Sequence, residues 1–98
     1  MKQRIIIFGG RGFVGKEVCA LLGRKYNIFT FDRHAGSKNH SQGDMLSVHD
    51  VDAAIKRNDL VINLVGLSPL KNPKGTTYKK VHVDAVKNIV SICKKKKV

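Results

Sequence analysis

Four glycines follow directly on a short apolar run near the N-terminus, and this combination restricts the possible folds more than any other feature. The run, Arg-Ile-Ile-Ile-Phe at residues 4–8, is continuous and β-branched, which predicts a strand buried on both faces. Gly9, Gly10, Gly12 and Gly15 come next, and the last three form the pattern G-x-G-x-x-G. Because the pattern follows a strand and opens a helix, it predicts a phosphate-binding loop of a dinucleotide site.

The segment after the loop has helical periodicity. Val14, Val18, Leu21 and Leu22 are spaced i, i+4, i+7 and i+8, which predicts that they form one helix face against the core. Gly23 follows and suits the C-terminal cap of that helix.

Each glycine of the loop has a physical purpose in this interpretation. An early glycine lets the chain turn sharply, Gly12 leaves room for the pyrophosphate, and Gly15 lets helix and strand pack closely. The N–H groups of the first helical turn then hold the phosphates. Asp32 lies 20 positions after Gly12, where a carboxylate accepts hydrogen bonds from the adenosine ribose.

Further elements alternate along the chain. Residues 26–32 predict a second strand, 39–42 a very short strand, and 60–65 a strand buried on both faces. Val51, Ala54 and Ile55 indicate a short helix capped by Ser47 or Asp50. A last helix, capped by Thr76 or Thr77, has an apolar face of Val81, Ala85, Val86, Ile89, Val90 and Cys93. This order predicts one α/β domain over residues 1–98, a Rossmann-type doubly wound parallel sheet of about four strands in order 3-2-1-4.

These segments resemble the short-chain dehydrogenase/reductase superfamily, in particular the nucleotide-sugar epimerases/dehydratases and the NAD(P)-binding relatives of a respiratory complex I accessory subunit. Residues 9–15 match the Gly-Gly-x-Gly-Phe-Val/Ile-Gly loop of these proteins, and residues 82–89 resemble a helix usually written Asn-Val-x-Gly-Thr-x-Asn-Leu. The resemblance implies that Asp44 and Met45 flank the adenine and that the end of the fourth strand lines the cofactor cleft. The expected cofactor contacts are Gly9, Gly10, Arg11, Gly12, Phe13, Val14, Gly15, Asp32, Arg33, Asp44, Met45, Leu64, Val65 and Gly66.

The cofactor type and the individual acids leave alternatives open. Asp32 would repel a 2′-phosphate and favours NAD, whereas Arg33 or Arg11 could pair with that phosphate and admit NADP. Asp44 can equally be a turn or capping residue. Asn63 and Asn88 can serve backbone hydrogen bonding alone.

Catalysis in the resembled superfamily uses a Tyr-x-x-x-Lys pair, in which the lysine lowers the pKa of the tyrosine. Neither Tyr26 nor Tyr78 is followed by lysine at the fourth position. We therefore expect an N-terminal portion without the catalytic and substrate-binding part, not catalytic by itself. The strand at 60–65 would then lie at a sheet edge and need a partner, either a second copy or the missing C-terminal half.

The net charge of +12 also permits a basic nucleic-acid-binding domain, but no nucleic-acid motif supports that interpretation. A non-catalytic NAD(P)-binding accessory or sensor module is the main alternative to the enzyme portion. The four histidines lack metal-ligand spacing, and we expect no metal site. Cys19 and Cys93 sit in apolar helical patterns, which suits a reducing compartment, and no apolar run approaches 18 residues. We expect a cytoplasmic protein without a transmembrane segment.

Overall fold

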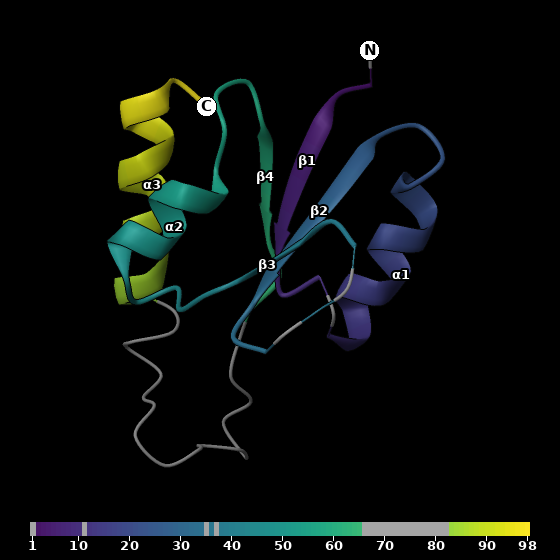
Figure 1. Cartoon of the computed structure of the whole chain (residues 1–98), viewed down its shortest axis with the longest axis horizontal. Coiled ribbons are helices and arrows are strands. Elements are labelled where there is room, and N and C mark those ends of the chain that lie inside the picture. Colours follow the sequence, from purple (N-terminus) through teal and green to yellow (C-terminus); the bar gives the residue numbers. More distant parts are fainter. Residues whose placement is uncertain (1, 11, 35, 37, 66–82) are drawn as a thin grey trace.

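A computed structural model describes residues 2–10, 12–34, 36, 38–65 and 83–98 of the chain. The chain forms a parallel sheet with helices on both faces (Figure 1). Its elements in chain order are β1 (Arg4–Phe8), α1 (Phe13–Leu22), β2 (Asn27–Asp32), β3 (His40–Gln42), α2 (Val48–Ala54), β4 (Leu60–Asn63) and α3 (Ala85–Lys96).

The sheet has four strands in the order β3-β2-β1-β4, and every neighbouring pair is parallel. In the register, Ile6 of β1 lies opposite Phe29 of β2 and Val61 of β4. The predicted fold class and strand order are therefore confirmed. Because all strands run the same way, the loops after β1, β2 and β4 emerge at one edge of the sheet.

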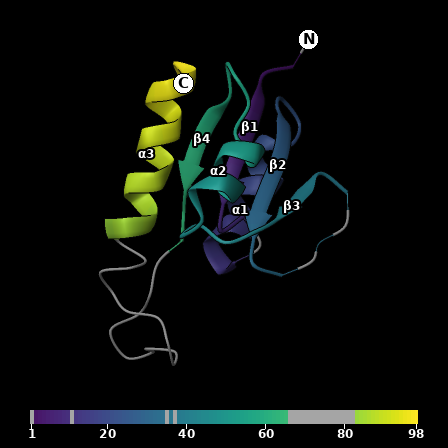
Figure 2. The same cartoon turned by 60° about the vertical axis from the view of Figure 1, so that its left-hand side comes forward.

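The main core lies between the sheet and the pair α2 and α3, while α1 covers the opposite face (Figure 2). Strand residues facing this core include Ile6, Phe8 and Phe31, and the Phe8 and Phe31 rings are 4.7 Å apart. The helices contribute Val51, Ala54, Ala85, Ile89 and Ile92 to the same cluster. These residues are at most 5% exposed, which gives a small chain one well-packed layer.

The predicted core face of α1 is right for Val18 and Leu22, which are half-buried, and wrong for Val14 and Leu21. Val14 and Leu21 are 58% and 78% exposed, and Gly15 is the buried residue of this helix. The helix meets the rest of the fold at Gly15, where the absence of a side chain allows the closest approach. Cys19, one turn further on, places its Sγ 3.6 Å from the carbonyl oxygen of Gly10. The more buried side of the helix thus contains Gly15, Val18, Cys19 and Leu22, which are spaced i, i+3, i+4 and i+7.

Two other helices follow the sequence more closely. Ser47 caps α2, because its Oγ accepts the backbone N–H of Asp50 at 3.2 Å. In α3 the buried face contains Ala85, Ile89 and Ile92, whereas Val90 is 46% exposed, so the predicted face is right in direction and wrong for Val90. The expected caps at positions 76 and 77 and the expected contact at position 81 lie outside the described residues.

Strand β4 is less buried than its apolar sequence predicts. It ends at Asn63 and pairs with β1, and Leu60 is 52% exposed. The expectation of a strand buried on both faces is therefore wrong. In the part of the chain that the structure describes, β4 forms an edge of the sheet, as expected from the strand order.

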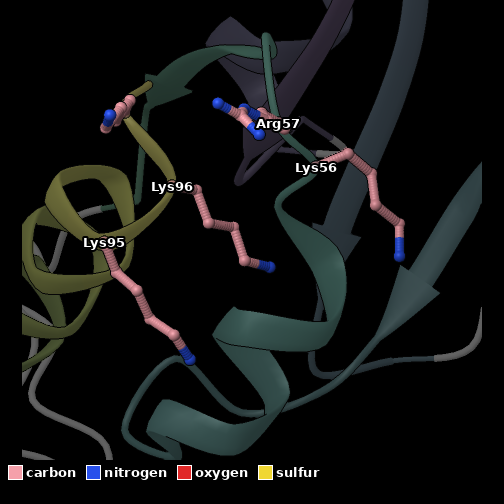
Figure 3. Close-up of a pocket in the computed structure, with 5 residues that line it drawn as sticks. Lys56, Arg57, Lys95 and Lys96 are labelled. Atoms are coloured by element: carbon pink, nitrogen blue, oxygen red, sulfur yellow. The ribbon is translucent and has the colours of Figure 1, made fainter.

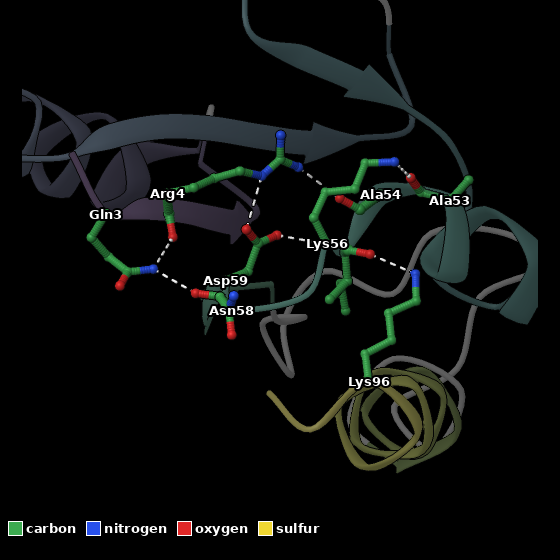
Figure 4. A network of polar contacts seen from close by, with 9 residues as sticks. Gln3, Arg4, Ala53, Ala54, Lys56, Asn58, Asp59 and Lys96 are labelled. Carbon is green, nitrogen blue, oxygen red and sulfur yellow. Dashed lines mark hydrogen bonds and ion pairs between the residues drawn. The ribbon is translucent and has the colours of Figure 1, made fainter. Parts of the chain in front are cut away.

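A partly buried ion pair joins the start of β1 to the turn before β4 (Figure 4). Arg4 Nε donates to Asp59 Oδ1 at 2.9 Å, and Asp59 Oδ2 accepts the backbone N–H of Lys56 at 2.8 Å. Arg4 also donates to the carbonyl oxygen of Ala54 and stacks over the Phe29 ring at 4.0 Å. The carboxylate, whose side chain is 1% exposed, therefore has a charged partner and a backbone donor, as a buried charge requires.

Among the described helices, none is long and apolar enough to cross a membrane.

Candidate functional site

The glycine loop sits between the carboxyl ends of β2 and β4. The N–H of Gly9 donates to the carbonyl oxygen of Phe31 at 3.2 Å, and the N–H of Leu64 donates to that of Phe8 at 2.8 Å. Gly9 has φ +82°, a left-handed conformation that favours glycine. A Cβ on Gly9 would lie 2.9 Å from Val65 Cγ2, so the loop is seated directly against the end of β4.

Gly10 and Gly15 allow two close approaches of the backbone. A Cβ on Gly10 would lie 2.6 Å from Thr30 Cγ2, and one on Gly15 would lie 2.3 Å from the carbonyl oxygen of Gly9. The backbone of Gly10 is within 2.6–2.7 Å of the same Gly15 position. The structure thus agrees with the packing purpose predicted for Gly15, because α1 rests directly on the backbone of the loop.

Gly12 differs from the other three glycines because, among the described residues, a Cβ there would make only an ordinary van der Waals contact. The nearest atom to a Cβ built there is the carbonyl oxygen of Gly9, at 3.4 Å. Gly12 is also the N-cap of α1 and offers no side-chain hydrogen bond to its first turn. Phe13 and Val14 beside it are 92% and 58% exposed. In the part of the chain that the structure describes, no side chain caps this positive end of the helix dipole, which fits an anionic group such as a pyrophosphate.

Asp32 ends β2 and is half-buried. Its Oδ1 accepts the backbone N–H of His34 at 2.9 Å, so the carboxylate has a fixed orientation. Arg33 is exposed, and its carbonyl oxygen accepts a hydrogen bond from Gln42 Nε2 at 3.3 Å. The hydrogen bond between Gly9 and the neighbouring residue Phe31 places the end of β2 beside the glycine loop.

The segment after β3 is used mainly for structure. Asp44 Oδ1 accepts the N–H of Leu46 at 2.9 Å, and the N–H of Asp44 donates to Asp50. Met45 is 8% exposed and packs in the core, and its carbonyl oxygen accepts from Asn88 Nδ2 at 2.9 Å. The structure thus gives Asp44 the turn interaction considered as an alternative, and it places the Met45 side chain among core residues.

The end of β4 supplies backbone to the site. Asn63 Oδ1 accepts the N–H of Val65 at 3.1 Å, which shapes the chain where it passes Gly9. Leu64 and Val65 are half-buried there. Arg11 and Gly66, both expected cofactor contacts, lie outside the described residues. The structure therefore brings together Gly9, Gly10, Gly12, Phe13, Val14, Gly15, Asp32, Leu64 and Val65 at one edge of the sheet.

Sequence reasoning missed His40 and Gln42 of β3, which hold the backbone just after Asp32. His40 Nε2 lies 2.9 Å from the carbonyl oxygen of His34, and Gln42 holds Arg33 as described above. The very short strand was located from polar residues, but nothing in that pattern indicates which side chain turns toward the preceding loop.

A hollow of 420 Å³ lies away from the glycine loop, near the start of β4 and the end of α3, and is lined by Lys56, Arg57, Lys95, Lys96 and Lys97 (Figure 3). Much of this charge is used internally. Lys96 Nζ donates to the carbonyl oxygens of Asp52 and Ile55, and Lys95 and Lys96 both pair with the Asp52 carboxylate. These hydrogen bonds, from Lys96 first and then Lys95, lower the pKa of Asp52 to about 2. The lysines therefore serve as caps of α2 at a helix end that favours cations.

Within the described ranges, no group of three or more histidine, cysteine or acidic side chains could hold a metal ion. Cys19 and Cys93 are both free thiols, and burial raises the pKa of each.

A parallel sheet in order 3-2-1-4, with a glycine loop after its central strand and an acid after the next, defines a Rossmann-type domain of the dinucleotide-binding class. Residues 5–98 match the NAD dependent epimerase/dehydratase family. The chain belongs to this family, and its resemblance to the short-chain dehydrogenase/reductases is thereby confirmed.

Solved structures show the same fold. Uronate dehydrogenase from Agrobacterium tumefaciens has a TM-score of 0.76 at 16% identity, over 95% of this chain and 36% of that one. L-threonine dehydrogenase from Clostridium difficile has a TM-score of 0.80 at 20% identity, over 98% and 34%. UDP-glucose 4-epimerase from Thermus thermophilus, in complex with NAD, has a TM-score of 0.79 at 20% identity, over 98% and 35%. The chain thus spans about a third of the length of these structures. A comparison with curated proteins gives no match.

Proposed function

We propose that this chain is the NAD(P)-binding portion of a short-chain dehydrogenase/reductase-like oxidoreductase or nucleotide-sugar epimerase/dehydratase. The observation that carries the proposal is the contrast among the glycines: a Cβ on Gly9, Gly10 or Gly15 would clash, while a Cβ on Gly12, at a helix N-terminus with no side-chain cap, would meet one atom at 3.4 Å. Packing explains why three of them lack a side chain. The packing of the described residues does not require Gly12 to lack one, which supports a bound ligand as the reason.

In this proposal the first turn of α1 holds the pyrophosphate through its N–H groups and dipole. Asp32 accepts hydrogen bonds from the adenosine ribose, and the end of β4 at Leu64 and Val65 lines the cleft. A bound nicotinamide cofactor supplies hydride transfer. The chain's own residues bind and orient it.

We propose that the 98 residues bind the cofactor without turning over a substrate. The support is chemical: the superfamily's Tyr-x-x-x-Lys pair does not occur in this sequence, and the chain spans about a third of the solved relatives. The exposed β4 edge, with Leu60 52% exposed, supports pairing with a second copy or with a C-terminal half.

NAD is the proposed cofactor. The carboxylate of Asp32 is held at the end of β2, where a negative charge accepts ribose hydroxyls and repels a 2′-phosphate. We also propose a reducing compartment, the cytoplasm, which is supported by two half-buried cysteines that are free thiols.

Titration with NADH and with NADPH, followed by nicotinamide fluorescence, tests the proposal. We expect saturable binding of NADH and weaker binding of NADPH. Folded protein, verified by circular dichroism, that binds neither would refute it. Strong salt-dependent binding to DNA or RNA without cofactor binding would favour the nucleic-acid interpretation instead.

A further inference from the structure

The connection between β2 and β3 begins immediately after Asp32, so its position controls which charges surround that carboxylate. Three exposed basic residues belong to it, Arg33, His34 and Lys38. Each could approach a group bound at Asp32 if the connection were free to move. Two side chains of β3, His40 and Gln42, instead hold its start in place.

His40 uses both ring nitrogens. Its Nε2 lies 2.9 Å from the carbonyl oxygen of His34, and a carbonyl only accepts, so Nε2 donates. In the neutral ring Nδ1 is then an acceptor, and it takes the hydroxyl proton of Thr30 at 2.6 Å. Thr30 and His40 are direct partners in the parallel register, so the sheet itself fixes this contact.

The connection also lies against the imidazole. A Cβ on Gly36 would be 2.4 Å from Cγ and 2.5 Å from Cδ2 of His40. Only a residue without a side chain can pass the ring at this distance. The imidazole is therefore both a hydrogen-bond anchor and a close packing partner of Gly36.

His34 joins this anchor to Asp32. Its carbonyl oxygen accepts from His40, and its own N–H donates to Asp32 Oδ1 at 2.9 Å. A continuous path of hydrogen bonds thus runs from the Thr30 hydroxyl through His40 and His34 to the carboxylate.

We propose that His40 is a positioning residue that sets the selectivity between NAD and NADP. By holding His34, it fixes the Asp32 carboxylate toward the ribose and keeps the neighbouring basic side chains directed to solvent. This arrangement favours a free 2′-hydroxyl over a 2′-phosphate. The inference rests on the proposed function, because it deepens the role of the same site.

The test compares dissociation constants for NADH and NADPH in wild type, His40→Phe and His40→Gln. Phenylalanine keeps a ring beside Gly36 but removes both nitrogens, so the NADPH to NADH ratio of dissociation constants should fall about tenfold, which corresponds to about 1.4 kcal/mol. Glutamine keeps a donor for the His34 carbonyl and should retain the wild-type ratio within about threefold. If His40 had only a structural role, its replacement would weaken the binding of both cofactors equally and leave the ratio of dissociation constants unchanged.

Thr30→Val provides a second variant if His40→Phe does not fold. Valine matches threonine in shape and removes only the hydroxyl that orients the imidazole, so the ratio should fall by about threefold. An unchanged ratio in the folded variants, with NADH still bound, would overturn the role of His40 and leave the proposed function intact. Failure of the wild type to bind either cofactor would overturn the proposed function, and the role of His40 with it.

Discussion

Replacing Gly12 by valine separates the folding of the glycine loop from its proposed binding function. Gly12 has φ −76° and ψ −178°, which any residue adopts, and its Cβ would have one neighbour, at 3.4 Å. Among the described residues, the Cβ of the new side chain would therefore meet one atom, at van der Waals distance. We expect the free energy of unfolding to fall by only about 0.5–1 kcal/mol, because valine is a poorer N-cap than glycine. In a chain of this size that lowers the thermal midpoint by about 2–8 °C.

Cofactor affinity should respond far more strongly than stability. The isopropyl group would occupy the space over the first turn of α1 that the pyrophosphate needs. We expect NADH binding to weaken by at least about 100-fold, or about 2.8 kcal/mol at 1.4 kcal/mol per tenfold.

The assay combines fluorescence titration with thermal unfolding in the same buffer. Ala20→Val is the matched control, because Ala20 is exposed on the same helix away from the loop, and it adds the same branched group. The control should lose a similar amount of stability and keep its NADH affinity. Unchanged NADH affinity in a folded Gly12→Val variant would refute the proposed loop geometry.

Three further predictions concern stability. Gly15→Ala places a methyl group 2.3 Å from a backbone oxygen of the loop, so urea unfolding should show a loss of about 2 kcal/mol or more, and a loss below about 0.5 kcal/mol would contradict the packing described. Asp59→Ala leaves Arg4 without its carboxylate and Lys56 N–H without its acceptor, and it should cost about 3 kcal/mol by the same measurement; a neutral result would show that the pair contributes nothing. The pKa of Asp52 falls from 3.8 to about 2, so this residue adds stability that is complete above about pH 4 and is lost as the pH falls through about 2. Thermal midpoints measured from pH 2 to 5 should therefore vary less in Asp52→Asn than in the wild type. An identical pH dependence in the two proteins would argue against the two lysine contacts.

The fold was predictable because its signals are local and mutually consistent. The apolar run at residues 4–8 became β1 without change, and the glycine loop lies where strand and helix meet. Strand order followed from the alternation of elements and from the right-handedness of parallel crossovers. The proximity of Asp32 to the loop follows from the same topology, since parallel strands end at one edge.

Orientation and burial were less predictable because they depend on contacts between distant segments. The buried side of α1 is centred on Gly15, which packs against the loop backbone, and a residue without a side chain gives no hydrophobic signal in the sequence. Leu60 has an apolar side chain, but its exposure depends on which segments pack against β4. The contacts of His40 depend on the register between β2 and β3. This register places Thr30 opposite His40 on the neighbouring strand, and neither residue alone indicates it.

The central position of β1 determines when the molecule can assemble during synthesis. β1 is synthesised first, and it pairs with β2 on one side and with β4 on the other. The partner of its Arg4 is Asp59, which follows 55 residues later in the chain. The layer that covers it is completed by Ala85, Ile89 and Ile92 of α3. Local helices can form as the chain emerges from the ribosome, but closing the sheet requires a long loop to be ordered first. We therefore expect the nascent chain to keep Ile6 and Phe8 exposed until α3 has emerged, which makes a holding chaperone useful in that interval.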